Sequence, residues 1–354
     1  MKKILAVHLL NNYSGSPRVF ASALDVLQDE GHEVTLLTSK GPGFLDGKGN
    51  KQVHIPYRWH ANRWLRLLLF MFSQVYLFFR MLTWWPKDVT IYINTLLPFG
   101  AAMAAKLMGK PVVYYCHETH IDPPLLNRWL RFWVETAADE LIIVSDYLRK
   151  ELQFQDKVFT VIPNVLPSEL LEDSKLPQVS RPDFNILMAA SLKKGKGLFE
   201  FVQLAEAMPE LPFTLVIGAD QEAIDVFFEG HSFPPNLTLL ARQGDMRPLY
   251  RKASVLLNLS VPGLFHETFG MTILEGMAYG LPVIVPPVGA PADIVTDGVD
   301  GYLVDSREMA NLKARLKALN TDSALYSQMS IAAQKTAAVY DQGSFAAGIE
   351  AVFA

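Results

Sequence analysis

The sequence predicts two α/β domains, each built on a doubly wound parallel sheet. Three observations lead to this fold class. The chain has 354 residues and half of them are hydrophobic, which is enough for two cores. Short apolar, β-branched runs alternate with helix-length segments, an order typical of parallel strands joined by crossover helices. The same order starts again after the Pro-, Ser- and acid-rich passage PSELLEDSKLPQVSRPD.

The first domain is expected to cover residues 1–164. Its first helix should run from Arg18 to Glu30, and a linker should follow near Pro163 to Pro182. The strands that we expect in this domain are KILAVHL, HEVTLLTS, VTIYIN, KPVVYYC, ELIIVS and FTVIP.

The second domain is expected to cover residues 165–334, with a helix from about Leu198. A final helix over about 335–354 should pack back on the first domain. Because ligands of such sheets bind at the carboxyl ends of the strands, we expect the binding cleft between the two domains. The strands that we expect here are FNILMAAS, FTLVIGA, LTLLAR, SVLLNLS, LPVIVPP and GYLVD.

Composition narrows the class of protein. Cys116 is the only cysteine, so the chain cannot form a disulfide framework or a thiolate metal cluster, which fits a reducing compartment. The start, MKKILAVHLL, is interpreted as a strand and not a signal peptide, which predicts a cytoplasmic protein. Residues 1–164 carry 18 Lys and Arg against 14 Asp and Glu, and the remainder carries 14 against 22. The basic half has no nucleic-acid reader motif, so it suits an anionic membrane surface better than nucleic acid.

The stretch HETFGMTILEGMAYGLPVIV places Glu267 in a loop and Glu275 inside a helix expected from about Met271 to Tyr279, with Thr268 or Thr272 as its cap. A helix start offers unpaired N–H groups and partial positive charge, so it predicts a phosphate cradle there. Two carboxylates beside an anion site would repel the anion unless they face sugar hydroxyls, from which carboxylates accept hydrogen bonds well. The pattern therefore predicts a diphosphate ligand flanked by polyols; the alternative is a solvated helix face.

The same stretch resembles the signature of glycosyltransferase family 4, the glycosyl transferases group 1, whose members have the GT-B fold. It shares Glu-x7-Glu, a small residue, Met-Ala and a Gly-x-Pro turn. SGSPRVFASALDVLQDEGHEVTLLT, VIPNV and GAPADIVTDGVDGYLVD resemble further family segments in the same order. The resemblance implies a GT-B fold with two Rossmann-like domains, and retaining transfer of a hexose from a nucleoside-diphosphate sugar, with UDP-hexose as the expected donor.

The resemblance also implies roles for single residues. Glu267 would hold donor-sugar hydroxyls, Glu275 the nucleotide ribose, and Lys196 of KKGKG the diphosphate. His117 would lie near the anomeric carbon; the alternative for it is a structural histidine at a strand end. Backbone amides that would meet the sugar and diphosphate are those of Phe269, Gly270, Met271 and Thr272.

Two positions depart from the family pattern. Ser191 stands where the family usually has an arginine, so Lys193 or Lys194 is the expected second charge, unless both are ordinary exposed lysines. Gly15 is expected at the diphosphate because a residue without Cβ allows close approach of the backbone. The second departure is Ser16, which stands where the family often has another glycine. Ser16 and Pro17 are interpreted as N-cap and first residue of the helix that follows.

No metal and no cofactor besides the nucleotide sugar are expected. The segment HETH lacks the helical i, i+4 spacing of a zinc protease, and the sequence contains no Asp-x-Asp motif. Lys196 together with the N–H groups of a helix start would neutralise the diphosphate in place of a metal.

A long apolar stretch over about 57–87 predicts peripheral membrane contact. The run from Leu67 to Phe79 is short for a membrane span, and Arg66, Ser73 and Arg80 recur at heptad spacing as one narrow polar stripe. Flanking tryptophans favour a helix lying in the membrane plane with its apolar surface inserted; a core or dimer helix is the alternative. The tryptophans are Trp64, Trp84 and Trp85.

These observations together predict a glycosyltransferase of polysaccharide biosynthesis at the inner face of the cell membrane. Its acceptor would be a sugar hydroxyl of a glycan or a lipid-linked sugar. A nucleotide-sugar 2-epimerase and a non-catalytic sugar-nucleotide-binding protein are the alternatives. The sequence leaves open the hexose, the base, the acceptor, the linkage and the oligomeric state.

Overall fold

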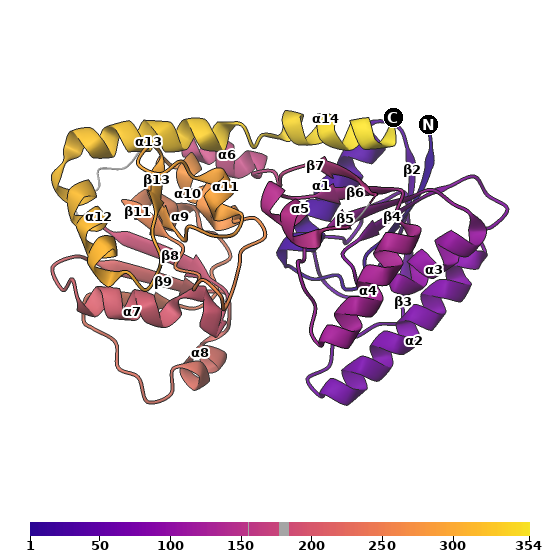
Figure 1. The fold of residues 1–354 in the computed structure, drawn as a ribbon, viewed down its shortest axis with the longest axis horizontal. Helices are drawn as coiled ribbons and strands as arrows, with labels where there is room; N and C mark the ends of the chain where they lie inside the picture. The colour runs from indigo at the N-terminus through magenta and orange to yellow at the C-terminus, as the bar shows by residue number, and fades with distance from the viewer. Residues whose placement is uncertain (155, 177–183) are drawn as a thin grey trace. The chain divides into compact units, whose positions relative to one another are not determined.

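The computed structural model describes residues 1–154, 156–176 and 184–354. They form two compact units: unit 1 consists of residues 1–164 with 343–354, and unit 2 of residues 165–342. Each unit contains one parallel sheet with helices beside it, as the strand and helix order predicts (Figure 1). The cleft that the sequence predicts between the two units stays a prediction.

The sheet of unit 1 has seven parallel strands in the order β3-β2-β1-β4-β5-β6-β7. The order reverses between β1 and β4, so the carboxyl ends of these two strands form the switch point where doubly wound sheets bind ligands. The edge strand β3 has the polar sequence KQVHI and was not predicted. The strands are β1 (Lys3–Val7), β2 (Glu33–Ser39), β3 (Lys51–Ile55), β4 (Thr90–Asn94), β5 (Val112–Cys116), β6 (Glu140–Ile143) and β7 (Val158–Val161).

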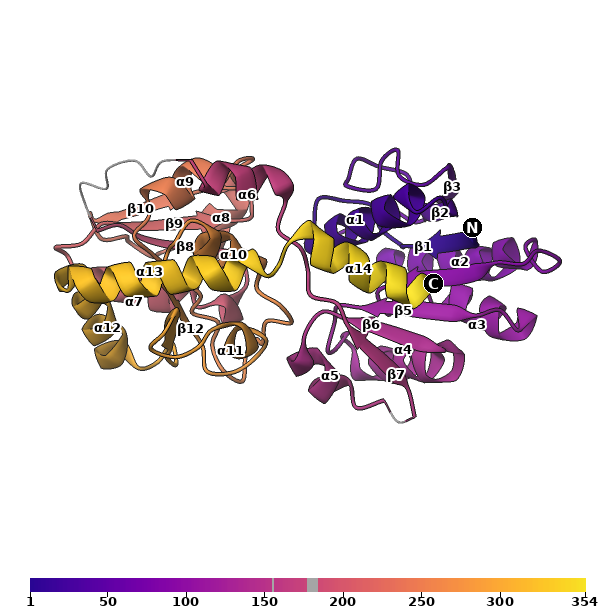
Figure 2. The same ribbon diagram turned by 90° about the horizontal axis from the view of Figure 1, so that it is seen from above.

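In the described residues of unit 1, six helices accompany this sheet. The predicted start of the first one is wrong: α1 begins at Gly15 with Ser14 as its N-cap, so Ser16 and Pro17 lie inside its first turn. The final helix α14 lies over the sheet of unit 1 (Figure 2), where the ring of Phe353 is 4.9 Å from that of Tyr92. The helices are α1 (Gly15–Asp29), α2 (Arg63–Leu82), α3 (Phe99–Met108), α4 (Pro124–Ala137), α5 (Asp146–Leu152) and α14 (Gln342–Phe353).

The sheet of unit 2 has six parallel strands in the order β10-β9-β8-β11-β12-β13. Its switch point lies between β8 and β11, and its apolar core packs between the sheet and helices that include α7 and α12. The strands are β8 (Ile186–Ala190), β9 (Phe213–Ile217), β10 (Leu237–Leu240), β11 (Val255–Leu257), β12 (Val283–Val285) and β13 (Gly301–Leu303).

The helices of unit 2 correct two expectations. Helix α6 lies inside the predicted linker at 163–182, of which residues 177–182 lie outside the described residues. The single helix expected over 335–354 is two helices, because α13 ends at Ala338 and α14 begins at Gln342. The helices are α6 (Ser168–Ser174), η1 (Lys194–Lys196), α7 (Leu198–Glu206), α8 (Gln221–Phe227), α9 (Arg247–Lys252), α10 (Met271–Ala278), α11 (Pro291–Ile294), α12 (Met309–Thr321) and α13 (Ser323–Ala338).

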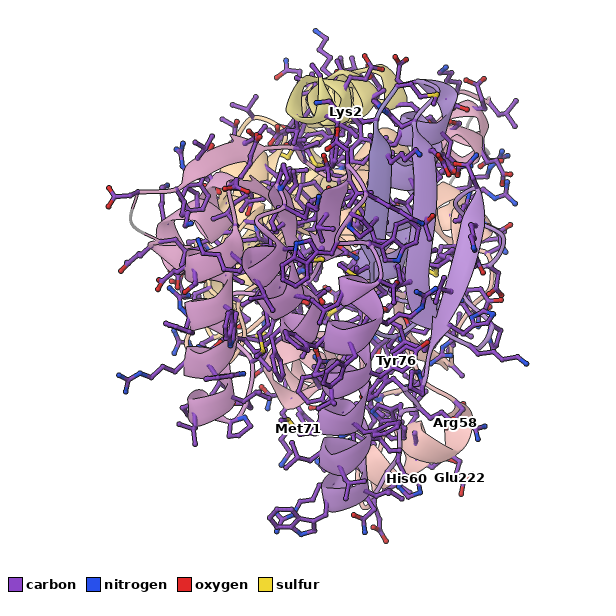
Figure 3. All side chains as sticks on the ribbon, turned by 90° about the vertical axis from the view of Figure 1, so that its right-hand side faces the viewer. Lys2, Arg58, His60, Met71, Tyr76 and Glu222 are labelled. Carbon is purple, nitrogen blue, oxygen red and sulfur yellow. The ribbon has the colours of Figure 1, made fainter. Side chains whose placement is uncertain are left out.

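Helix α2 turns its apolar side outward, and the predicted polar stripe lies at its packed side. Ser73 is fully buried, and Arg66 and Arg80 are half-buried. Helix α3 lies against this side of α2: the Gly100 N–H donates to Gln74 Oε1 at 3.0 Å. A Cβ on Gly100 would lie 2.1 Å from the Gln74 carbonyl oxygen, so the two helix backbones pack closely. The exposed side, which carries Met71 (Figure 3), is apolar.

Candidate active site

Unit 2 has a hollow of about 360 Å³ at the carboxyl ends of β8, β9 and β10. The start of α10 and the turn η1 complete its walls. Its size and its place at the strand ends are those of a ligand site in a doubly wound sheet. The lining residues are Ala189, Ala190, Ser191, Lys196, Val216, Gly218, Arg242, Gln243, Met246, Glu267, Gly270, Met271 and Thr272.

Helix α10 starts at the wall of this hollow. Its N-cap is Gly270 and not Thr268 or Thr272 as predicted. Gly270 has a φ of +123°, and a Cβ there would lie 2.9 Å from Ile273 Cδ1, so only glycine fits without strain. Because the N-cap has no side chain to accept from the first-turn N–H groups, the helix start offers donors and partial positive charge to an anion.

Lys196 and Glu267, both predicted site residues, form an ion pair at this wall. Lys196 Nζ donates to Glu267 Oε1, and Asn258 Nδ2 donates to the same oxygen at 3.2 Å. The two side chains are only 11% and 18% exposed. Burial lowers the pKa of the Lys196 ammonium from its ordinary value; the attraction of Glu267 opposes this, and the nearby charge of Lys193 adds to it. The pair therefore brings a partly desolvated cation to the start of α10.

The glycine after Lys196 explains why the turn holds this position. Gly197 has a φ of +76°, and a Cβ there would lie 2.0 Å from the Leu259 carbonyl oxygen. Any larger residue would push η1 away from the segment that follows β11. The last glycine of KKGKG is thus a packing requirement as well as part of a family resemblance.

Glu275 is not on a solvated helix face, the alternative that the sequence left open. It is buried, and its Oε2 accepts from the Tyr250 hydroxyl at 2.6 Å. This hydrogen bond ties α10 to α9. Glu275 is not among the residues that line the hollow, so its ribose contact stays a prediction.

The other predicted residues of unit 2 divide into two groups. Ser191, Gly270, Met271 and Thr272 line the hollow. Three do not line it in this structure: Phe269 packs on Tyr340 with ring centroids 6.0 Å apart, and Lys193 and Lys194 are exposed. Their contacts with a ligand stay predictions.

Sequence reasoning missed Arg242, which lines the hollow directly after β10. Its Nη2 donates to the Gly218 carbonyl oxygen at 3.0 Å, so its guanidinium is held at the end of β9. The signal was present in the sequence, since LTLLAR ends a strand on arginine and strand ends meet at one edge of the sheet. Arg242 is a further candidate for the second positive charge that Ser191 does not supply.

Unit 1 holds the two remaining predicted residues. His117 follows β5, and its Nε2 lies 2.8 Å from Asn94 Oδ1; burial lowers its pKa to about 3. Gly15 is the first residue of α1, and a Cβ there would meet nothing within 4 Å. The protein itself therefore does not require glycine at position 15, and a ligand contact there stays a prediction.

Within the described ranges, no group of three or more His, Cys, Asp and Glu side chains is arranged to hold a metal ion. In the HETH segment, His120 Nε2 lies 3.1 Å from Asp122 Oδ1.

The fold, two doubly wound Rossmann-like units, is that of the GT-B proteins. Residues 13–169 match the family model described as Glycosyltransferase Family 4, and residues 173–336 match the model described as Glycosyl transferases group 1. The two matches together span most of the chain, which therefore belongs to this family of glycosyltransferases.

Curated relatives align with part of this chain at about one quarter sequence identity. The trehalose synthase of Thermococcus litoralis is 27% identical over 222 residues, which are 55% of this chain and 52% of that protein. The putative glycosyltransferase EpsD of Bacillus subtilis is 25% identical over 262 residues, which are 67% of this chain and 68% of that protein. This chain spans only about half of the trehalose synthase and 20% of the sucrose synthase 2 of Hordeum vulgare.

Solved structures share the fold over the whole chain. The Anabaena protein HepE in complex with UDP-glucose has a TM-score of 0.79 at 18% identity and covers 100% of this chain and 99% of its own. The sucrose-phosphate synthase of Thermosynechococcus elongatus has a TM-score of 0.78 at 16% identity, covering 100% and 98%. At these identities the likeness concerns the fold.

Proposed function

We propose that the protein transfers a hexose from a nucleoside-diphosphate sugar, with UDP-hexose as the donor, to a hydroxyl acceptor. The observation that carries this proposal is the Lys196–Glu267 pair beside the uncapped start of α10. A cation and a helix start suit the diphosphate, and a carboxylate suits the hydroxyls of the sugar. The complex of the fold relative HepE with UDP-glucose is consistent with such a donor.

The proposed reaction proceeds with retention and without a metal. The bond between the anomeric carbon and the diphosphate oxygen breaks, and the acceptor oxygen bonds to the same face of that carbon. The acceptor proton passes to the departing phosphate oxygen, so no side-chain base is needed. Charge that develops on this oxygen is stabilised by the Lys196 ammonium, the N–H groups of α10 and the Arg242 guanidinium. The partial burial of Lys196 strengthens its interaction with this charge.

Donor binding would rearrange the ion pair. A diphosphate competes with Glu267 for Lys196, because both are anions that accept from the same ammonium. The carboxylate, which Asn258 still holds at 3.2 Å, would then turn to the sugar hydroxyls. Before the donor binds, the ion pair thus holds the Lys196 and Glu267 side chains in place and balances their charges.

A two-stage experiment tests this function. Nucleotide sugars are first screened for thermal stabilisation of the protein, since a ligand that binds only the folded state raises its stability. The stabilising donor is then incubated with a lipid extract, and release of free nucleotide is measured. We expect release that depends on the extract. Conversion of the donor without acceptor would indicate the 2-epimerase, and binding without either product would indicate a sugar-nucleotide sensor.

We further propose that unit 1 docks on an anionic bilayer at the cytoplasmic face of the cell membrane. By length and composition alone, α2 is the one helix in the described part of the chain that could cross a membrane. Because one side of α2 is packed on α3, the helix instead fits a position in the membrane plane. Its exposed side chains include Trp64, Leu65, Leu67, Leu68, Met71, Phe72, Val75 and Phe79.

Helix α4 extends this apolar surface. Its exposed large apolar residues are Leu125, Trp129 and Phe132. The ring of Phe99 on α3 lies 5.9 Å from that of Trp129 and 5.9 Å from that of Phe70 on α2, so α3 joins the two helices. An apolar surface spread over two neighbouring helices exceeds what scattered surface residues provide.

The charge of the segment around α2 favours anionic lipid over a protein partner. Residues 51–87 contain six Lys and Arg and no Asp or Glu. Each basic residue near an anionic surface contributes about 1 kcal/mol. A bilayer position would bring the enzyme to a lipid-linked sugar, which is the acceptor that we propose, in polysaccharide biosynthesis.

A further inference from the structure

Three polar side chains meet at the switch point of the unit 1 sheet. His8 follows β1, Asn94 ends β4 and His117 follows β5, and these three strands are neighbours. Asn94 stands between the two histidines: its Nδ2 lies 2.9 Å from His8 Nδ1, and its Oδ1 lies 2.8 Å from His117 Nε2. His8 and Asn94 are buried, so their hydrogen bonds cannot be exchanged for water without cost.

The backbone of α1 fixes which way the Asn94 amide points. Asn94 Nδ2 also lies 3.2 Å from the carbonyl oxygen of Ser16. A carbonyl oxygen can only accept, so the amide nitrogen must face Ser16, and with it His8. The amide oxygen then faces His117, and an amide oxygen can only accept as well. His117 Nε2 must therefore carry a proton.

We propose that Asn94 is a positioning residue that holds His117 as the neutral Nε2–H tautomer, so that Nδ1 accepts a hydrogen bond from a sugar hydroxyl of the donor. The sugar in this statement rests on the proposed function; the tautomer does not. His8 serves as the anchor on the other side, because its Nδ1 accepts from the same amide.

The surroundings of His117 keep it neutral. Burial lowers the pKa of His117 to about 3, and the neighbouring His8, whose own pKa burial lowers to about 4, acts in the same direction. The ring of Tyr115 lies 4.4 Å from that of His117, and burial raises the pKa of both Tyr115 and Cys116. Glu118 Oε2 accepts from the His117 backbone N–H at 3.4 Å, and burial raises its pKa to about 7.

Long-range ¹H–¹⁵N spectra of protein labelled with ¹⁵N-histidine test the tautomer directly. The chain has eight histidines, and His117→Gln assigns the signals of His117 by their loss. His120→Gln, which changes a more exposed histidine three residues away, is the matched control. At pH 7 we expect His117 protonated on Nε2 and unprotonated on Nδ1. A protonated Nδ1 in the wild-type protein overturns the proposal.

Asn94→Asp tests the role of the amide. A carboxylate keeps the acceptor for Nε2 but adds a negative charge, so the imidazolium of His117 becomes favourable and its pKa rises. We expect His117 to titrate at a pH at least one unit higher than in the wild-type protein, and donor turnover to fall as pH decreases through that value. An unchanged titration of His117 in a folded variant contradicts the positioning role. If this variant does not fold, the tautomer of His117 in the wild-type protein still tests the proposal.

Adding the stabilising nucleotide sugar separates this inference from the proposed function. A shift of the Nδ1 resonance on binding, with the Nε2 proton retained, supports the whole proposal. An Nε2–H tautomer in a protein that transfers no sugar refutes the function and leaves the tautomer standing. Sugar transfer by a protein whose His117 carries its proton on Nδ1 refutes the inference alone.

Discussion

Glu275 offers the sharpest separation between a structural and a ligand-binding role. Its buried Oε2 accepts from the Tyr250 hydroxyl at 2.6 Å, which joins α10 to α9. A hydrogen bond to a charged group contributes about 1.5–3 kcal/mol. Tyr250→Phe removes only this hydroxyl, so we expect the free energy of unfolding to fall by about that amount. The nucleotide affinity should stay as in the wild-type protein.

Glu275→Ala removes the same hydrogen bond together with the acceptor that we expect for ribose hydroxyls. It should lower the free energy of unfolding by a similar amount. In addition it should weaken binding of free nucleoside diphosphate by about 1.5–3 kcal/mol, which is roughly ten- to hundredfold.

Urea unfolding and titration calorimetry with the free nucleotide measure the two effects on the same protein samples. If Glu275→Ala and Tyr250→Phe both bind the nucleotide like the wild-type protein, Glu275 only holds α10 on α9 and the ribose contact is refuted. If Tyr250→Phe leaves the unfolding free energy unchanged, the assigned hydrogen bond is wrong.

Three further outcomes are expected. Glu267→Ala should spare the free nucleotide and weaken the intact donor, and equal losses in calorimetry would contradict the sugar contact. Transfer should continue in excess chelator, because Lys196 and α10 supply the positive charge; activity lost and then restored by magnesium or manganese would refute this. Wild-type protein should float with anionic liposomes, with part of the binding lost in salt. Leu68→Glu with Phe72→Glu, at positions 64% and 57% exposed, should abolish flotation, whereas Val226→Glu with Ile331→Glu, at positions 70% and 55% exposed, should not. A wild-type protein that dimerises and does not float would assign the surface to a second copy.

Local sequence predicts the fold well where burial dominates. The strands β1, β4 and β5 are short apolar runs, and such runs are buried on both faces of a parallel sheet. β3 was missed because an edge strand needs little apolar sequence, and KQVHI has only two apolar residues. The start of α10 at Met271 was predicted correctly. The start of α1 and the cap residue of α10 were predicted wrongly because several neighbouring residues suit an N-cap, and tertiary contacts choose among them.

Family motifs predicted that certain residues come together, but they did not predict contacts with residues outside those motifs. Glu267 and Lys196 were expected in one site, and they form an ion pair. The contact of Glu275 with Tyr250 joins residues 25 positions apart and leaves no sequence pattern. The outward side of α2 could not be known either, because α3 packs on the side that carries Ser73.

The central claim is that Lys196, with the start of α10, binds the diphosphate of a nucleotide sugar. Calorimetry with the stabilising donor on the wild-type protein, Lys196→Met and Lys252→Met tests it most directly, because Lys252 is an exposed lysine of the same unit that does not line the hollow. We expect Lys252→Met to bind like the wild-type protein, and a folded Lys196→Met to bind roughly ten- to hundredfold more weakly, the effect of one charged hydrogen bond. Equal affinity in all three proteins, or no binding of any nucleotide sugar, would contradict the claim.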